Sequence, residues 1–263
     1  MFKASANLNL MIKAARNAAR GLLRDFGEVE NLQVTSKSLG DFVTKADIKA
    51  EEAIYKELTE SRPQYGWLAE ESSLKKGKDP TRYWIVDPLD GTTNYIHGIP
   101  HWGISVALEF KSEIIAAVIY DPIKDELFVA EKGSGSWLNN RRLRVSNRKN
   151  LSDMLFATGV PFGNNPNLDL TLREIKNLLP VCSGIRRSGS AALDLAYVAA
   201  GRYDGFWERN LNPWDIAAGI LIVKEAGGFI SGIDSNLSPL ESGNIIASNT
   251  DVYEKFAKLL DRK

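Results

Sequence analysis

The chain has 263 residues, 44% of them hydrophobic and 25% charged, a composition typical of a globular protein long enough to bury a core. Lysine plus arginine and aspartate plus glutamate number 33 each, so the net charge gives no reason to expect direct binding to nucleic acid or to an anionic membrane. No apolar stretch suits a signal peptide or a membrane span, which predicts a cytoplasmic protein. The single cysteine, Cys182, excludes an internal disulfide, and we interpret it as a small residue in a strand.

The N-terminal part carries two predicted helices. Apolar residues recur at helical spacing over 8–26 and predict an amphipathic helix. Thr44-Lys45-Ala46-Asp47 has the pattern of a capping box, which predicts a second helix that continues to about Leu58. Two interpretations of Asp47 remain open: a reciprocal cap residue, which is the commoner case, or an acid that a helix start directs into a site.

Acidic residues follow the next two predicted strands. Residues 65–69 form a short strand that ends in Glu70-Glu71-Ser72, and residues 84–87 form a buried strand that ends in Asp87. A polar loop is predicted between them at residues 75–80. Pro88 prevents a helix, and Asp90 follows in a turn. Two carboxylates held together repel each other unless a cation, a donor or a proton lies between them, and oxygen ligands favour Mg²⁺. A metal site is the first hypothesis, and a solvated or hydrogen-bonded loop is the alternative.

Strand-like runs at residues 103–110, 113–120 and 126–130 have the spacing of an antiparallel meander. Two shorter strands flank Asn139-Asn140. The cluster of Arg141, Arg142 and Arg144 alternates with apolar residues, which favours a solvated strand face over a nucleic-acid patch.

Beyond residue 150, helices and strands alternate. Predicted strands cover residues 155–158, 181–187, 203–207, 229–233 and 244–247, and predicted helices cover residues 168–179, 191–200, 212–223 and 250–260. The change in pattern predicts a single domain over 1–263 with subdomains at about 1–150 and 151–263.

Two of these helix starts carry polar residues. Ser188-Gly189-Ser190 leaves backbone N–H groups at a helix start, which suits a phosphate, although any capped helix offers the same. Asn212-Pro213-Trp214-Asp215 is a strong helix start, and the helix dipole alone would explain an acid at Asp215.

Several of these segments together resemble one family. Residues 68–72, 87–94 and 213–219 closely resemble the three signature segments of the inositol monophosphatase family of Mg²⁺-dependent phosphatases. The resemblance continues through residues 43–47 and 225–228 and spans nearly the whole chain.

The resemblance implies an α+β fold with layers in the order αβαβα and metals at the junction of its two halves. By residue, it implies one Mg²⁺ on Glu70, Asp87 and the Leu89 backbone carbonyl, and a second on Asp87, Asp90 and Asp215. Family members can also use Glu70 in a third, weaker site, so two or three ions are expected. Carboxylates that a fold brings together need divalent cations to offset their repulsion, which agrees with this assignment.

The mechanism implied is direct attack of a metal-activated water on phosphorus, without a phosphoenzyme. Thr92, hydrogen-bonded to Asp47, would help to orient and deprotonate that water, with Glu70 assisting through the metal. The phosphate would lie against the backbone N–H groups of Gly91 and Thr92. The residues implied to meet the substrate's hydroxyls are Asp90, Gly189, Ser190, Ala191, Glu208 and Asp215.

Arg186 or Arg187 would reach the substrate or the partner in a homodimer, and we place Arg186 slightly ahead. Residues 204–215 resemble bacterial inositol monophosphatases, and Glu208 is an acceptor suited to a polyol hydroxyl. The leading hypothesis is therefore Li⁺-sensitive hydrolysis of myo-inositol 1-phosphate or a similar polyol phosphate. One alternative is a histidinol-phosphate or other small sugar or nucleotide phosphatase. Another is a binding partner of the transcription or ribosome-assembly machinery.

Overall fold

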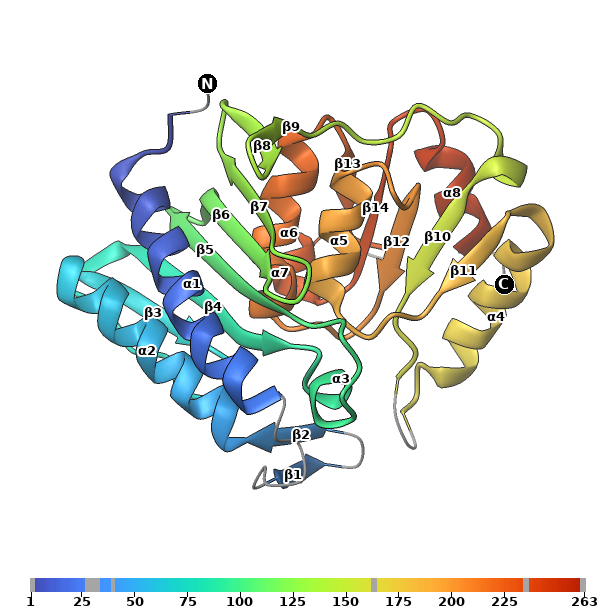
Figure 1. Cartoon of the computed structure of the whole chain (residues 1–263). Helices are drawn as coiled ribbons and strands as arrows, with labels where there is room; N and C mark the ends of the chain where they lie inside the picture. The colour runs from blue at the N-terminus through green and yellow to red at the C-terminus, as the bar shows by residue number, and fades with distance from the viewer. Residues whose placement is uncertain (1–2, 27–33, 39–40, 162–164, 234–236, 261–263) are drawn as a thin grey trace.

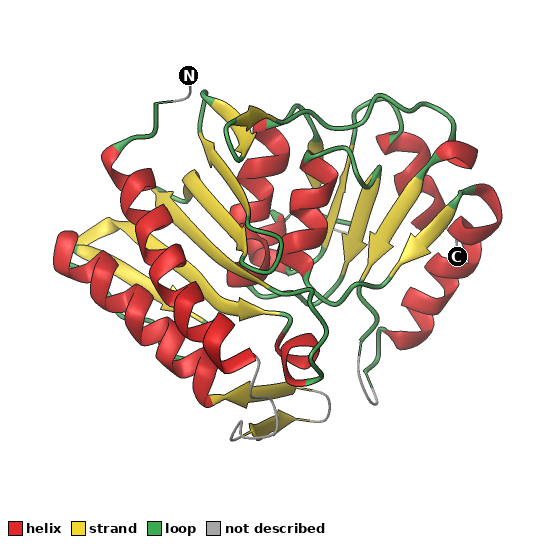
Figure 2. Cartoon of the chain, viewed as in Figure 1, coloured by secondary structure: helices red, strands yellow, loops and turns green. Residues whose placement is uncertain are grey.

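Helices and sheets alternate in five layers in the computed structural model, which describes residues 3–26, 34–38, 41–161, 165–233 and 237–260 (Figure 1; Figure 2). From one side to the other the layers are a helix pair, a seven-stranded sheet, a second helix pair, a five-stranded sheet and a third helix pair. This confirms the αβαβα arrangement.

The outer helix pair covers one face of the larger sheet. It consists of α1 (Ala6–Phe26) and α2 (Lys45–Ser61). Leu8, Met11 and Leu22 lie at helical spacing on the buried face of α1, in a core cluster shared with α2 and the sheet. The predicted capping box of α2 is present: the Thr44 N–H donates to Asp47 Oδ2 at 2.9 Å, and the Asp47 N–H donates to Thr44 Oγ1 at 3.4 Å.

The seven-stranded sheet has its strands in chain order. Its first two strands are parallel and all later neighbours are antiparallel, which confirms the predicted meander. The strands are β3 (Tyr65–Ala69), β4 (Asp79–Asp90), β5 (Gly103–Phe110), β6 (Glu113–Asp121), β7 (Glu126–Glu131), β8 (Gly135–Leu138) and β9 (Arg141–Arg142).

The central helix pair separates the two sheets. It consists of α5 (Ala191–Ala199) and α6 (Pro213–Glu225). Every residue of α5 is buried, because the helix packs in a cluster that draws side chains from both sheets. This burial explains the nearly continuous run of apolar residues in α5.

The five-stranded sheet has the order β11-β10-β12-β14-β13. Its strands are β10 (Leu155–Thr158), β11 (Gly184–Arg186), β12 (Gly205–Glu208), β13 (Phe229–Ser231) and β14 (Ile245–Ser248). The helices α4 (Leu168–Leu178) and α8 (Tyr253–Leu260) pack against its outer face through a third core cluster. A short helix, α7 (Pro239–Ser242), lies between β13 and β14 in the chain.

Several local predictions were wrong. The strand predicted at 181–187 is reduced to β11, because a 3₁₀ turn occupies Leu179–Val181, and Cys182 therefore lies between elements rather than in a strand. Glu208 ends β12 rather than following it. The helix α3 (Thr92–Ile96) and the hairpin of β1 (Val34–Ser38) and β2 (Asp41–Thr44) had not been predicted.

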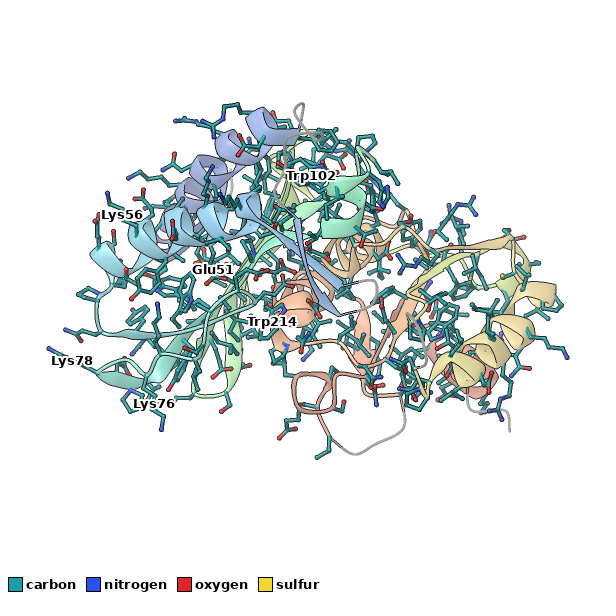
Figure 3. All side chains as sticks on the ribbon, turned by 90° about the horizontal axis from the view of Figure 1, so that it is seen from below. Glu51, Lys56, Lys76, Lys78, Trp102 and Trp214 are labelled. Carbon is teal, nitrogen blue, oxygen red and sulfur yellow. The ribbon has the colours of Figure 1, made fainter. Side chains whose placement is uncertain are left out.

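The loop predicted at 75–80 is shorter than expected. Lys75 exchanges two backbone hydrogen bonds of 2.9 Å with Trp67, and Asp79 already begins β4. Lys76 and Lys78 project outward at the edge of the molecule, whereas Trp102 is buried (Figure 3).

Within the described residues, no helix combines the length and the apolar character that crossing a membrane requires.

Asp204 holds the connection between the two sheets in place. Its buried carboxylate accepts hydrogen bonds from Ser146 Oγ at 2.5 Å, Arg148 Nη1 at 3.0 Å and the Leu155 N–H at 2.8 Å. We expect Asp204→Ala to lower the free energy of unfolding by about 3 kcal/mol, because it leaves these three donors without their acceptor. Urea denaturation measures this change. Asp153→Ala, at an exposed site nearby, should change stability by less than about 0.5 kcal/mol, and an equal loss in both variants would contradict the assignment.

Candidate active site

Asp87 and Asp90 lie at the end of β4, where the pairing with β5 is irregular. Asp87 is opposite Ser105 and Asp90 is opposite Gly103, so the register shifts between them. Residues three apart on a regular strand point to opposite faces, but an extra residue in the strand re-aims the side chains that follow. The bulge at Pro88 and Leu89 thus brings the two carboxylates to one site, and Asp87 Oδ1 accepts a hydrogen bond of 2.9 Å from the Leu89 N–H.

Glu70 reaches the same place from the neighbouring strand. Because β3 and β4 are parallel with Ala69 opposite Val86, the residue after Ala69 lies beside Asp87. The Glu70 N–H donates to the Val86 carbonyl at 3.3 Å. The buried Glu51 of α2 fixes the loop that follows, since its Oε2 accepts the Glu71 N–H at 2.8 Å.

Asp215 enters the site from the second half of the chain. It lies in the first turn of α6, where its Oδ2 accepts the Asn212 N–H at 2.7 Å and completes a capping box. Ser105 Oγ of β5 donates to the Trp214 carbonyl at 3.2 Å, which joins this helix start to the larger sheet. Asp215 is therefore both a cap residue and a member of the acidic cluster.

These carboxylates repel one another. Burial, followed by the charges of Glu70, Asp90 and Asp215, raises the pKa of Asp87 well above its usual range. Burial also raises the pKa of Asp90 to about 6, although several hydrogen bonds oppose the shift. Burial, then the charge of Asp90, raises the pKa of Asp215 as well.

An oxygen-rich cluster of this kind suits a hard divalent cation, because the cation replaces the mutual repulsion by attraction. Among the described residues, no group of three or more His, Cys, Asp and Glu side chains is already gathered in a form that could hold a metal ion. The hydrogen bonds at Asp87, Asp90 and Asp215 each engage one carboxylate oxygen. The donor set therefore fits Mg²⁺ in its chemistry.

Asp47 and Thr92 form a hydrogen-bonded pair next to this cluster. Asp47 is fully buried, with Oδ2 engaged by Thr44 and Oδ1 at 3.1 Å from Thr92 Oγ1. The same Thr92 hydroxyl lies 3.1 Å from the Leu89 carbonyl, so it donates to one acceptor at a time. Asp47 therefore caps α2 through one oxygen, and its second oxygen accepts a hydrogen bond from Thr92. Burial raises the pKa of Asp47.

The start of α5 holds Asp90. Ser190 caps the helix: its Oγ accepts the Leu193 N–H at 3.3 Å and donates to Asp90 Oδ2 at 2.5 Å. The Ala192 N–H donates to the same oxygen at 2.7 Å. A carboxylate from β4 therefore occupies the anion-binding position that the sequence suggested for a phosphate.

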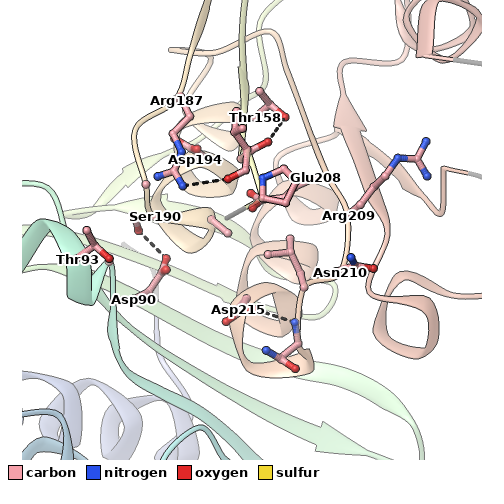
Figure 4. A pocket seen from close by; sticks show the side chains of 18 of the residues that line it. Asp90, Thr93, Thr158, Arg187, Ser190, Asp194, Glu208, Arg209, Asn210 and Asp215 are labelled. Carbon is pink, nitrogen blue, oxygen red and sulfur yellow. Dashed lines mark hydrogen bonds between the residues drawn. The ribbon is translucent and has the colours of Figure 1, made fainter. Parts of the chain in front are cut away.

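A cavity of about 410 Å³ opens beside these groups. Arg187, Asp194 and Glu208 gather at the end away from Asp90 (Figure 4). Burial raises the pKa of Glu208 to about 8, although the charge of Arg187 opposes the shift. The predicted residues that line the cavity are Glu70, Asp90, Gly91, Thr92, Gly189, Ser190, Ala191, Glu208 and Asp215.

Both neighbouring arginines are exposed, but Arg187 lines the cavity and Arg186 is not among the lining residues. Asp47 and Asp87 are buried and are not among the residues that line the cavity.

Sequence reasoning missed Asp194. It lines the cavity one helical turn after Ser190, and its Oδ1 is buried without a hydrogen-bond partner among the described residues. Burial, then the charge of Glu208, raises the pKa of Asp194 well above its usual range. The available signal was an acid inside an otherwise apolar helix.

Comparison with known proteins assigns the chain to a family of phosphomonoesterases. The family model described as the inositol monophosphatase family matches residues 5–263. The inositol-1-monophosphatase of Rhizobium meliloti (strain 1021) is 51% identical over 258 residues, which cover 98% of this chain and 97% of that protein. The chain belongs to the inositol monophosphatase family.

Two further relatives extend the comparison. The crystal structure of extragenic suppressor protein suhB from Bartonella henselae has a TM-score of 0.95 and 52% sequence identity, with coverage of 98% of this chain and 99% of that one. The Nus factor SuhB of Pseudomonas aeruginosa is 44% identical over 251 residues, which cover 94% of this chain and 93% of that protein.

Proposed function

We propose that this chain hydrolyses myo-inositol 1-phosphate or a similar small polyol phosphate with the help of Mg²⁺. The observation that carries the proposal is the acidic cluster of Glu70, Asp87, Asp90 and Asp215 beside a cavity whose far end carries Glu208. The close relative named inositol-1-monophosphatase supports the substrate class.

In this proposal one Mg²⁺ would be held by Glu70, Asp87 and the Leu89 carbonyl. A second would be held by Asp87, Asp90 and Asp215, and Glu70 would take part in any third. The bound ions supply a lowered pKa for water and charge stabilisation for the oxygens around phosphorus.

The chain's own groups orient the attacking water and receive its proton. When the Thr92 hydroxyl donates to Asp47, its lone pairs are free to accept a hydrogen bond from that water. The buried Asp47, whose pKa is raised, is suited to take the proton that Thr92 relays. The phosphate lies against the backbone N–H groups of Gly91 and Thr92 at the start of α3.

The alcohol part of the substrate lies toward Glu208, which can accept hydrogen bonds from its hydroxyls. Asp194 at the same end provides a second carboxyl group, and this favours histidinol phosphate, with its ammonium group, as the second candidate substrate. A ratio of kcat/KM values for the two phosphates decides between them.

A substrate panel with and without Mg²⁺ and Li⁺ tests the proposed function. We expect turnover of myo-inositol 1-phosphate that requires Mg²⁺ and, by analogy with the family, is inhibited by millimolar Li⁺, since Li⁺ is a small, hard cation that oxygen ligands accept. Phosphate release is the measurement, and Na⁺ at equal ionic strength is the control. Activity that survives chelation of all divalent cations would contradict the metal assignment.

The proposal also includes a cytoplasmic location and, by analogy with the family, a homodimer, with Arg186 directed to the partner and Arg187 to the substrate. A relative named Nus factor is the support for a binding role in transcription, and its identity to this chain is lower than that of the relative named inositol-1-monophosphatase. We therefore keep the phosphatase as the proposed function.

A further inference from the structure

Glu208 is held in a space that only glycine leaves open. A Cβ atom at Gly159 would lie 1.7 Å from Glu208 Oε1 and 2.0 Å from its Cδ, far inside contact distance. A backbone hydrogen bond from Gly159 also supports the carboxylate. Gly159 is not among the residues with positive φ, so alanine is compatible with its backbone. Glycine is therefore needed here for the position of Glu208 and not for conformational freedom.

A second buried acid holds the residues on either side of Glu208. Glu174 of α4 accepts the Trp207 Nε1–H at Oε2 at 3.0 Å. Its Oε1 accepts Arg209 Nε and Nη2 at 3.1 and 2.6 Å. The side chains of Glu174 and Arg209 are 1% and 6% exposed. Thr158 Oγ1 adds a hydrogen bond of 2.7 Å to the Trp207 carbonyl.

A buried ion pair contributes little net stability, because desolvation of both charges offsets their attraction. What this pair provides is a defined position for the end of β12. One carboxylate binds the residue before Glu208 and the residue after it, while Gly159 leaves the space for its side chain.

We propose that Gly159 and Glu174 are positioning residues that determine recognition of the substrate's alcohol group. They hold the Glu208 carboxyl group where its oxygen accepts a hydrogen bond from a hydroxyl of the polyol, at the end of the cavity away from the acidic cluster. This inference rests on the proposed function.

Steady-state kinetics of Gly159→Ala and Glu174→Gln at saturating Mg²⁺ test it. We expect KM for myo-inositol 1-phosphate to rise about tenfold with kcat nearly unchanged, because a hydroxyl contact is lost while the reaction centre is not touched. Turnover of p-nitrophenyl phosphate, whose alcohol carries no further hydroxyl, should stay within about twofold. In a Glu208→Ala background, which lacks both the hydroxyl acceptor and the atoms that a Cβ at residue 159 would meet, Gly159→Ala should add almost nothing to KM.

Matched controls are Gly21→Ala, since a Cβ there meets no atom within 4 Å, and Glu113→Gln, at an exposed pair with Lys132. Both should leave all parameters unchanged. Glu174→Gln retains the size of the side chain and an acceptor for Trp207, so a loss in this variant reports the charge at Arg209.

Thermal unfolding provides a readout that needs no substrate. Gly159→Ala should lower Tm by about 2 °C with Glu208 present, because the end of that side chain must move, and by much less with Glu208→Ala, because the clash is then removed. The absence of this coupling overturns the inference. If the parent chain hydrolyses inositol phosphate, KM values equal to the parent's in both Gly159→Ala and Glu174→Gln also overturn it. A chain that shows the coupling but does not hydrolyse inositol phosphate refutes the proposed substrate instead.

Discussion

Asp90→Asn is expected to reduce kcat/KM at saturating Mg²⁺ by on the order of 10³-fold, the largest effect that we predict for a single substitution. The asparagine side chain has the same shape and retains an acceptor for Ser190 and Ala192, which both donate to one oxygen of Asp90. What it removes is the negative charge that a divalent cation needs. Phosphate release from myo-inositol 1-phosphate measures the change.

The same substitution should not destabilise the metal-free protein. The charge of Asp90 raises the pKa of Asp87, so its removal relieves repulsion inside the cluster. We therefore expect an equal or higher Tm without Mg²⁺ and a smaller rise in Tm when Mg²⁺ is added. Asp79→Asn, near the edge of the sheet at an ion pair with Arg82, is the matched control and should retain full activity. Near-normal activity of Asp90→Asn would remove the basis for the metal assignment.

Glu208→Gln should change how the stability of the metal-free protein depends on pH. Below pH 4.5, the ordinary pKa of glutamate, the side chain is neutral in both the folded and the unfolded chain. Above that value the unfolded chain ionises, while burial keeps the folded carboxyl neutral up to a pKa of about 8. The folded state then binds more protons than the unfolded state, so the free energy of unfolding falls as the pH rises through this window.

Urea denaturation at several pH values measures the effect. The advantage of the glutamine variant over the parent chain should grow between about pH 5 and about pH 8 and exceed about 1.4 kcal/mol, the equivalent of one pKa unit. The charge of Glu208 also raises the pKa of Asp194 and of Asp215, so the difference between the two proteins reports Glu208 together with its coupling to these two acids. Glu113→Gln should show the parent's slope. Parallel curves for the parent and Glu208→Gln would contradict a buried Glu208.

Local pattern was enough to predict most of the regular elements, although not α3 or the β1–β2 hairpin. The helical spacing in α1, the capping box at Thr44 and the meander of β5 to β7 each depend on residues close together in the chain. The layered fold came from the family resemblance and not from these patterns, because no local rule states how two sheets share one helix pair.

The acidic residues could be picked out, but their convergence could not be derived. Asp87 and Asp90 share a site because of a bulge in the pairing with β5, and pairing registers between distant strands are not visible in a local pattern. Arg186 and Arg187 could not be separated for the same reason: a shift of one residue decides which side chain lines the cavity.

Tertiary contacts explain the remaining differences. Cys182 follows a 3₁₀ turn that propensity alone does not indicate. The roles inferred for Gly159 and Asp194 depend on their proximity to Glu208, which is distant in sequence. No local motif therefore marks either residue.

The two sheets contribute to the site in different ways, and this separates two tasks. Apart from Asp215, the acidic cluster lies in β4 and just after β3, whereas the residues that position Glu208 lie in α4, at the end of β12 and just after β10. In the proposed function, bond cleavage and the choice of leaving alcohol therefore depend on different parts of the framework. Redesign confined to the smaller sheet can alter which ester is accepted while the machinery that breaks the ester stays in place.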